Sequence, residues 1–255
     1  MNLQNGNCLD LMKDLPDKSI DLFICDLPYG ETNCKWDSKI DMDEFWSEFK
    51  RLRKSKRTAC IHFCSTKFGY TLIKSWEKGF KMDMVWKKRN KTGGLQSRHR
   101  PMRNHEMVYF FYEQAPKYNR DKYHKRIVAT KPNVKEEVVE DMDEFGWSIG
   151  KLPKENRGKE GFKPVLPVSV VEEPKSMFES KKVFIGKRHH QTEKPQDILE
   201  FFLKYWTDEN DTVLDPTMGS GSTGVACKKL NRKFIGFELD EKIFKVAKNR
   251  CKCGS

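Results

Sequence analysis

Four consecutive residues, Asp26, Leu27, Pro28 and Tyr29, combine groups that suit chemistry on an exocyclic amine. Such an amine is a poor nucleophile because its lone pair is delocalised into the ring. The Asp26 carboxylate and the Pro28 carbonyl can accept both amino hydrogens, which favours a tetrahedral nitrogen whose lone pair points at a sulfonium methyl. The Tyr29 ring offers a surface on which a flipped base can stack, worth about 1–3 kcal/mol. Taken alone, the four residues are more often a simple Asp-Pro turn.

Residues 215–224 form a glycine- and serine-rich segment that carries a second candidate site. Gly219, Gly221 and Gly224 match G-x-G-x-x-G, a spacing that lets the backbone turn sharply and approach a ligand at a helix N-terminus. Glu238 follows Gly219 by 19 positions, at the end of the next predicted strand. There a carboxylate can accept hydrogen bonds from both ribose hydroxyls of an adenosine-bearing cofactor. The motif alone leaves two alternatives, a dinucleotide site and a tight turn beside a solvated Glu.

Both segments follow short apolar runs, and the chain around them alternates between predicted strands and helices. We predict strands over 21–25, 58–64, 80–86, 107–112, 212–215 and 233–238. We predict helices over 43–54, 67–77, 195–206, 223–230 and 241–249, the last capped by Asp240. This alternation indicates an α/β sheet with helical crossovers. Only 31 residues follow Gly224, so a six-stranded sheet must draw its remaining strands from the N-terminal half.

Taken together and in this order, the motifs resemble the beta group of amino-methylating DNA methyltransferases, and more locally its phage and prophage members. The resemblance covers most of 1–113 and 187–255. It is carried by residues 26–37 (DLPYGETNCKWD), 45–52, 86–87, the pair His105-Glu106, 190–195 (HQTEKP), 215–227 and 234–240.

The resemblance implies a Rossmann-like methyltransferase fold, with a mixed, mostly parallel sheet, helices on both faces and a circularly permuted motif order. It implies direct methyl transfer from S-adenosylmethionine by inversion, with Asp26, Pro28 and Tyr29 gripping the target base. It also implies a set of cofactor-binding residues: Asn7, His190, Thr192, Lys194, Asp215, Pro216, Gly219, Ser220, Gly221, Ser222 and Glu238.

Three positions depart from the family pattern. Leu27 stands where proline is usual, Gln191 stands where proline normally follows the histidine, and Asn7 stands where the family often has Asp. None of the three removes a catalytic atom. The departures leave open a catalytically silent relative that binds DNA.

An Asp-initial loop is typical of enzymes that methylate adenine N6, whereas a Ser-initial loop is typical of N4-cytosine enzymes. The resemblance therefore favours the exocyclic N6 of a flipped adenine, with N4-cytosine as the alternative. Methylation at cytosine carbon 5 needs a cysteine nucleophile after proline, and the chain has no Pro-Cys dipeptide. An NAD-dependent oxidoreductase built on the glycine motif is a further alternative.

The chain of 255 residues has 49 Lys and Arg against 37 Asp and Glu, a net charge of +12, which favours an acidic partner such as double-stranded DNA. No apolar run approaches the ~20 residues of a membrane helix, and the N-terminus has no signal layout. We therefore expect a cytoplasmic protein, bacterial or in the host cytoplasm if phage-encoded. The eight scattered cysteines predict reduced, packed thiols and no metal site.

Two stretches without any Asp or Glu account for this charge. The first, +7, is the predicted DNA-binding set, expected on a loop after a strand that lies beside the one carrying Asp26: Lys87, Lys88, Arg89, Lys91, Arg98, Arg100 and Arg103. If about seven phosphates are neutralised, log K should fall with log salt at a slope near −6. The second, +6, comprises Lys50, Arg51, Arg53, Lys54, Lys56 and Arg57. A solvated face is the alternative for each stretch.

We divide the chain into a catalytic half, 1–113, an insertion, 114–186, and a cofactor-binding half, 187–255. The insertion lacks clear periodicity and has a net charge of only +3, from 15 Lys and Arg against 12 Asp and Glu. Its place in the chain suggests a target-recognition region, with a variable solvated insertion as the alternative. A homodimer and a partner restriction endonuclease stay open.

Overall fold

The computed structural model describes residues 1–30, 40–92, 94, 97–119, 122, 170–172 and 193–253, without the side chains of 89–92, 170–172 and 253. The chain divides into two compact units, one formed by Met1–Asn119 with Val168–Ser255 and the other by Arg120–Pro167. All helices and strands named below belong to the first unit. No helix in these ranges has the length and apolar character that crossing a bilayer requires.

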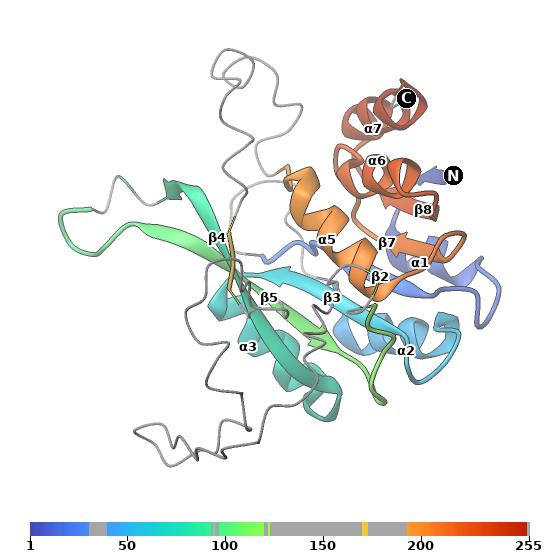
Figure 1. The fold of residues 1–255 in the computed structure, drawn as a ribbon, viewed down its shortest axis with the longest axis horizontal. Coiled ribbons are helices and arrows are strands. Elements are labelled where there is room, and N and C mark those ends of the chain that lie inside the picture. Colours follow the sequence, from blue (N-terminus) through green and yellow to red (C-terminus); the bar gives the residue numbers. More distant parts are fainter. Residues whose placement is uncertain are drawn as a thin grey trace, which may run out of the picture. The chain divides into compact units, whose positions relative to one another are not determined.

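An eight-stranded sheet runs through the first unit (Figure 1). Its strands, in spatial order, are β1 (Asn2–Asn5), β8 (Lys233–Glu238), β7 (Thr212–Asp215), β2 (Leu22–Cys25), β3 (Ala59–Cys64), β5 (Arg103–Phe111), β4 (Phe80–Thr92) and β6 (Val170–Glu172). All neighbouring pairs are parallel except those made by β5, which runs antiparallel to β3 and β4. The mixed, mostly parallel sheet confirms the predicted α/β class.

Helices cover both faces of this sheet. One face is covered by α1 (Cys8–Lys13), α2 (Met42–Leu52) and α3 (Thr66–Ser75), which the short 3₁₀ helix η1 (Glu77–Gly79) follows. The other face is covered by α5 (Gln196–Trp206), α6 (Ser222–Lys229) and α7 (Glu241–Cys253).

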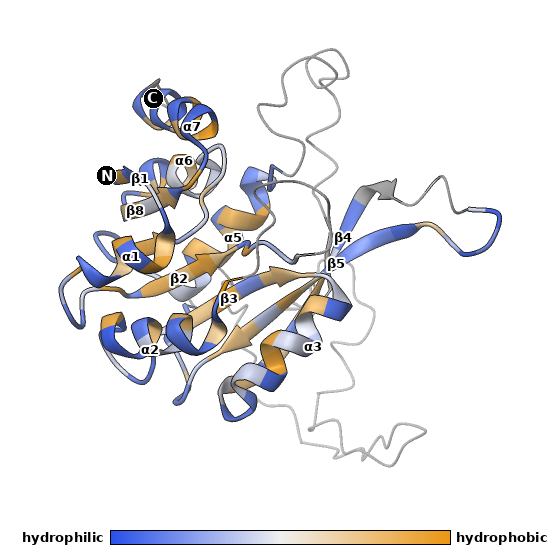
Figure 2. Cartoon of the chain, turned by 180° about the vertical axis from the view of Figure 1, so that it is seen from behind, coloured by the Kyte–Doolittle hydropathy of each residue, from blue (hydrophilic) through white to orange (hydrophobic). Residues whose placement is uncertain are grey.

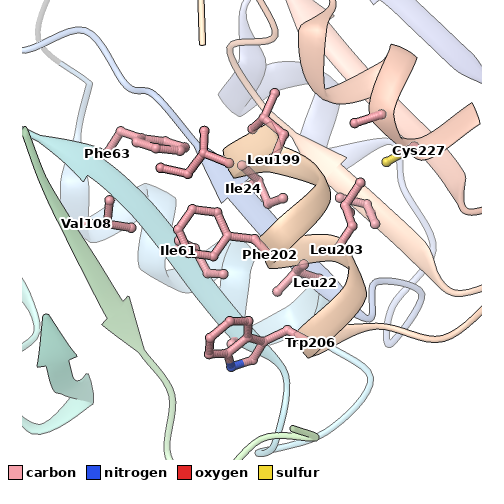
Figure 3. Close-up of a cluster of buried hydrophobic side chains, with 14 of the residues drawn as sticks. Leu22, Ile24, Ile61, Phe63, Val108, Leu199, Phe202, Leu203, Trp206 and Cys227 are labelled. Carbon is pink, nitrogen blue, oxygen red and sulfur yellow. The ribbon is translucent and has the colours of Figure 1, made fainter. Parts of the chain in front are cut away.

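Both faces of β2 are buried, because its alternating side chains enter the two hydrophobic cores in turn. Leu22 and Ile24 belong to the core under α5, where Phe202 also packs (Figure 3), whereas Phe23 and Cys25 belong to the core under α2. A strand covered on both faces reads as a continuous apolar run, which explains the sequence signal. Hydrophobic residues accordingly gather on β2, β3 and α5, and the outer ends of β4 and β5 are hydrophilic (Figure 2).

The structure corrects three expectations. The sheet has eight strands and not six, because the polar N-terminal residues form β1 and a segment of the insertion forms β6. The expected loop over 87–105 is wrong at both ends, since β4 continues to Thr92 and β5 begins at Arg103, so that 87–92 and 103–105 belong to the strands of a projecting arm. Finally, β4 does not lie beside β2, because β3 and β5 lie between them.

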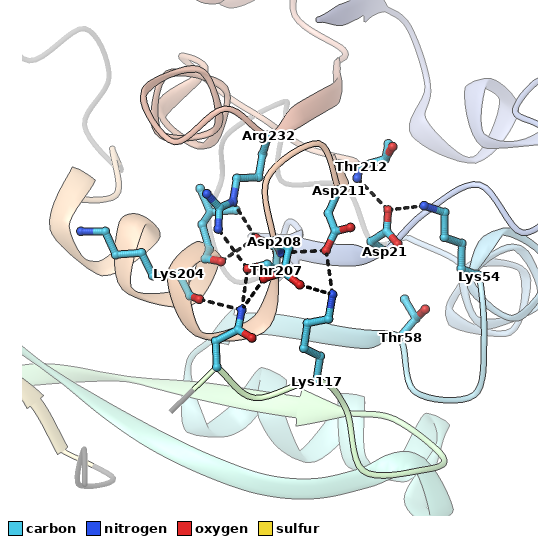
Figure 4. A network of polar contacts seen from close by, with 12 residues as sticks. Asp21, Lys54, Thr58, Lys117, Lys204, Thr207, Asp208, Asp211, Thr212 and Arg232 are labelled. Carbon is cyan, nitrogen blue, oxygen red and sulfur yellow. Dashed lines mark hydrogen bonds and ion pairs between the residues drawn. The ribbon is translucent and has the colours of Figure 1, made fainter. Parts of the chain in front are cut away.

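The second basic stretch, 50–57, lies at the amino edge of the parallel strands and is held in ion pairs. Arg53 pairs with Glu113 at 2.7 Å, and Lys54 pairs with Asp21 at 2.6 Å. Figure 4 shows the Lys54–Asp21 pair within a larger polar network at this edge, which also includes Arg232. These pairings favour the solvated face over a nucleic-acid contact for this stretch.

Candidate active site

Both candidate loops reach the carboxyl edge of the sheet. Asp26 follows β2, Asp215 ends β7, and Glu238 ends β8. Because β8, β7 and β2 are consecutive parallel strands, the three carboxylates lie along one edge, where open α/β sheets bind ligands. In the chain the β2 loop comes first, so the N-terminal half brings Asp26 to an edge that the C-terminal half completes.

The Asp26 carboxylate has a partner at each oxygen. Its Oδ1 accepts a hydrogen bond from the Tyr29 hydroxyl at 3.0 Å, and its Oδ2 lies 2.5 Å from Nζ of Lys194. The backbone carbonyl of Asp26 accepts from the Thr217 hydroxyl at 3.1 Å. This last bond ties the Asp26 loop to the glycine loop.

The two residues that flank Pro28 differ in burial. Leu27 is 1% exposed and packs in the core under α2, so an apolar side chain is accommodated where the family has proline. The Tyr29 ring is half-buried and stacks on Phe68, with centroids 4.9 Å apart and 25° between the ring planes. Burial, followed by the charge of Asp26, raises the pKa of the Tyr29 hydroxyl, which therefore stays protonated as a donor.

Lys194, expected near the cofactor, lies against the Asp26 loop. Besides Asp26, its ammonium has Glu106 Oε2 at 3.8 Å and lies 5.1 Å from the centre of the Phe63 ring. Burial alone would lower the pKa of Lys194, but the two carboxylates raise it above its ordinary value. His190 and Thr192 lie outside the described residues.

Each of the three loop positions is glycine for a different structural reason. Gly219 has φ +54°, and a Cβ built there would meet no atom within 4 Å, so the space in front of it is open. Gly221 also has a positive φ, +82°, at the N-cap of α6. A Cβ on Gly224 would lie 2.8 Å from both Phe234 and Cys251, so this glycine permits close helix–strand packing.

Glu238 fastens the glycine loop from the neighbouring strand. Its Oε2 accepts a hydrogen bond from the Gly219 amide at 3.1 Å, and its Oε1 accepts from the Asp240 amide at 2.8 Å. Asp240 in turn caps α7 through the Lys242 and Ile243 amides, which confirms the predicted cap.

Asp215 braces the same loop from inside. It is 4% exposed, and its carboxylate accepts from the Thr217 amide at 3.1 Å and from the Thr223 hydroxyl at 2.7 Å. Burial raises the pKa of this carboxyl to about 7, although the two hydrogen bonds oppose the rise.

A pH dependence of stability follows from this raised pKa. Between the unfolded pKa near 4 and the folded value of about 7, the native protein binds one proton that the unfolded chain has released. The contribution of this proton to the free energy of unfolding is therefore complete below pH 4 and is lost as pH rises through 7. In the wild type the free energy of unfolding should therefore decrease between pH 5 and pH 8. We expect this decrease to be smaller in Asp215→Asn by on the order of 2 kcal/mol. Urea denaturation at the two pH values measures this, and an unchanged difference in the variant contradicts it.

The remaining predicted cofactor residues differ in burial and in their hydrogen-bond partners. The Ser220 hydroxyl binds Nη1 of Arg250 at 2.6 Å, and the Ser222 hydroxyl donates to Glu193 at 3.2 Å, so both serines brace the loop. Asn7 is exposed, and its side-chain oxygen caps α1 by accepting a hydrogen bond from the Leu9 amide at 2.9 Å. Pro216 is buried in the turn after β7.

Four of the seven predicted DNA-binding residues are exposed on the projecting arm of β4 and β5: Lys87, Arg98, Arg100 and Arg103. Arg103 also donates to the Thr66 hydroxyl at 3.2 Å. Lys88 instead turns into the site and pairs with Glu106. The side chains of Arg89 and Lys91 lie outside the described part of the structure.

The six cysteines with described side chains are buried and free of disulfides, as predicted. Three soft ligands meet under α2, with Cys60 Sγ 3.7 Å from Cys25 Sγ and 3.2 Å from His62 Nε2. A structural zinc takes four ligands, and its histidine donates its second ring N–H to an acceptor. Within the described residues this group offers three ligands, and Nδ1 of His62 has no hydrogen-bond partner. We interpret it as hydrogen-bonded core packing.

The strand order, the helices on both faces and the two loops at one edge define a Rossmann-like methyltransferase fold. Residues 20–249 match the DNA methylase family (N6_N4_Mtase), and the chain belongs to it. The Type II methyltransferase M1.MboII of Moraxella bovis is 27% identical over 245 residues, which cover 92% of this chain and 90% of that protein.

A shorter and stronger match is to the Type II methyltransferase M2.LlaDCHI of Lactococcus lactis subsp. cremoris, 48% identical over 66 residues. That match covers 26% of this chain and 24% of the relative's length. Among solved structures, the M1.HpyAVI–SAM complex superposes with a TM-score of 0.59 at 22% identity, covering 98% of both chains.

Proposed function

We propose that this DNA methylase transfers a methyl group from S-adenosylmethionine to the exocyclic N6 of a flipped adenine. The observation that carries the proposal is the bond between the Thr217 hydroxyl and the Asp26 carbonyl, 3.1 Å long. It joins the segment that offers an amine acceptor to the segment that offers a cofactor cradle. Methyl donor and amine can therefore meet at one edge of the sheet.

The residues present fit an adenosine-bearing sulfonium cofactor. The open space at Gly219 admits a ligand close to the backbone, and Glu238 brings a carboxylate to the same turn for ribose hydroxyls. When bound, the cofactor supplies an electrophilic methyl group on a positively charged sulfur. We propose His190, Thr192 and Asn7 as further contacts to it.

The chain's own residues prepare the amine. Asp26 and the Pro28 carbonyl would accept the two amino hydrogens, so that the nitrogen lone pair points at the methyl group. Tyr29 is held by its hydroxyl on Asp26 and by Phe68 behind its ring, which fixes the ring before a base stacks. Such preorganisation lowers the entropy cost of placing the base.

Nucleoside analysis tests the choice of base. DNA methylated with radiolabelled S-adenosylmethionine is digested to nucleosides, and we expect the label in N6-methyl-2′-deoxyadenosine. Label in N4-methyl-2′-deoxycytidine establishes the alternative enzyme. A DNA shift without label indicates a silent relative, and thermal stabilisation by NAD but not by S-adenosylhomocysteine indicates an oxidoreductase.

We propose that the β4–β5 arm binds phosphates around the flipped base and that residues 114–186 recognise the target sequence. Lys88 pairs with Glu106 and is left out of the proposed phosphate contacts, which reduces the predicted set from seven residues to six. We therefore expect log K to fall with log salt at a slope of about −5. Arg98→Ala with Arg100→Ala should make the slope less steep by about 2. A wild-type slope near −1 or −2 in a salt titration contradicts the arm as the phosphate-binding surface.

A further inference from the structure

The site contains a buried acid that the proposed chemistry does not use. Glu106 lies on β5, and its Oε1 accepts a hydrogen bond from Lys88. The other oxygen, Oε2, is buried and has no hydrogen-bond donor among the described residues. Burial would raise the pKa of Glu106, but Lys194 and Lys88 keep it below its ordinary value, so the group is charged. A buried charged oxygen without a donor costs free energy, which points to a donor in another state of the site.

Lys194 is a second cation close to that oxygen. Its Nζ is 3.8 Å from Glu106 Oε2 and 2.5 Å from Asp26 Oδ2. A charge-assisted N–H···O bond spans about 2.7–2.9 Å, so a shift of about 1 Å would give Lys194 a hydrogen bond to Glu106. The flexible stem and three donors of a lysine permit such a shift.

Asp26 is a weaker acceptor for the target amine while the lysine stays in place. Its Oδ1 already takes the Tyr29 hydroxyl, and its Oδ2 takes Lys194. The ammonium takes one acceptor position of Oδ2 and offsets the negative charge that would attract the amino hydrogens. The proposed chemistry, however, requires this carboxylate to attract the amino hydrogens of the target base.

We propose that Lys194 has two positions, on Asp26 in this structure and on Glu106 Oε2 when the target base enters. Glu106 is then a positioning residue that draws the lysine off the catalytic carboxylate. The exchange keeps one charge-assisted hydrogen bond in each state and completes the pairing of Glu106. Lys88 fixes Glu106 through Oε1, so the acid stays in place while the lysine moves. This inference rests on the proposed function.

A double-variant cycle in the full chain tests the exchange. Glu106→Gln keeps the size of the side chain and removes its charge, so the lysine should remain on Asp26. We expect the single-turnover rate of methyl transfer to fall at least tenfold, with the Kd values for S-adenosylhomocysteine and DNA within twofold of wild type. Without the lysine there is nothing to move, so Glu106→Gln should change the rate of a Lys194→Met background by less than threefold.

Each other result has a definite meaning. A wild-type rate in Glu106→Gln, or an equal loss from Glu106→Gln in both backgrounds, overturns the exchange. If Glu106→Gln does not fold, Glu106→Asp keeps the charge but withdraws it by one methylene, and the same cycle applies. Glu113→Gln, an acid paired with Arg53 at the opposite edge, is the matched control and should transfer at the wild-type rate. Absence of transfer by the wild-type chain instead overturns the proposed function itself.

Discussion

Asp26→Ala should lower the rate of methyl transfer to DNA at least ~100-fold while the cofactor still binds. The substitution removes the carboxylate that would accept the amino hydrogens of the base. It keeps the backbone carbonyl, which takes the Thr217 hydroxyl and anchors the glycine loop. Cofactor affinity should therefore stay within about threefold of wild type. Single-turnover transfer of label to DNA measures the rate, and calorimetry with S-adenosylhomocysteine measures the affinity.

Two comparisons make this prediction specific. Asp10→Ala changes an exposed acid of α1 that faces Lys13 at 3.9 Å, and it should leave both quantities unchanged. Full activity of Asp26→Ala removes the central assignment of the site. A joint loss of transfer and cofactor binding shows instead that Asp26 supports the fold of the edge.

The sequence predicts the sheet where burial decides the structure. β2, β3, β7 and β8 lie inside the sheet between two layers of helices, so each reads as an apolar run bounded by turn residues. β1 is different, because its four residues are polar or half-exposed and their strand conformation depends on pairing with β8. Tertiary pairing of this kind has no local signal.

The arm of β4 and β5 is missed for a related reason. Its outer residues are mostly Lys, Arg and Asn, with neither a buried face nor alternation, and they resemble a basic loop. Pairing of the two segments with each other holds them extended, as in the contact of Lys87 with His105. The charge of this stretch could be read from the sequence, but its strand pairing could not.

Within the site, order along the chain predicts which loops meet but not which side chains pair. Lys194 and Asp26 are 168 positions apart, and the bond between them depends on how β2 and the segment before α5 lie in space. Spacing within a motif likewise suggests that Ser220 and Ser222 face a ligand. In the structure their hydroxyls bind Arg250 and Glu193, a pairing that the spacing alone does not reveal.

Glu238→Ala should weaken binding of S-adenosylmethionine about 100-fold. In the proposed complex the carboxylate accepts both ribose hydroxyls, and a hydrogen bond to a charged group contributes about 1.5–3 kcal/mol. Two such bonds at the lower value give about 3 kcal/mol, and each 1.4 kcal/mol is a factor of ten. The variant also frees the amides of Gly219 and Asp240, so the loop itself loses its support. Calorimetric titration measures the change in Kd.

The matched control lies three positions further on. Glu241 is an exposed acid in the first turn of α7 that pairs with Lys245 at 2.7 Å, so Glu241→Ala should bind the cofactor as wild type does. Glu238→Gln separates charge from geometry, because the amide oxygen still accepts one loop N–H while the negative charge is gone. If Glu238→Ala binds within threefold of wild type, the ribose is held elsewhere and the cofactor assignment of this edge is wrong. If Glu238→Gln loses as much as Glu238→Ala, the charge on the carboxylate holds the ribose, and the loop contacts of Glu238 are secondary.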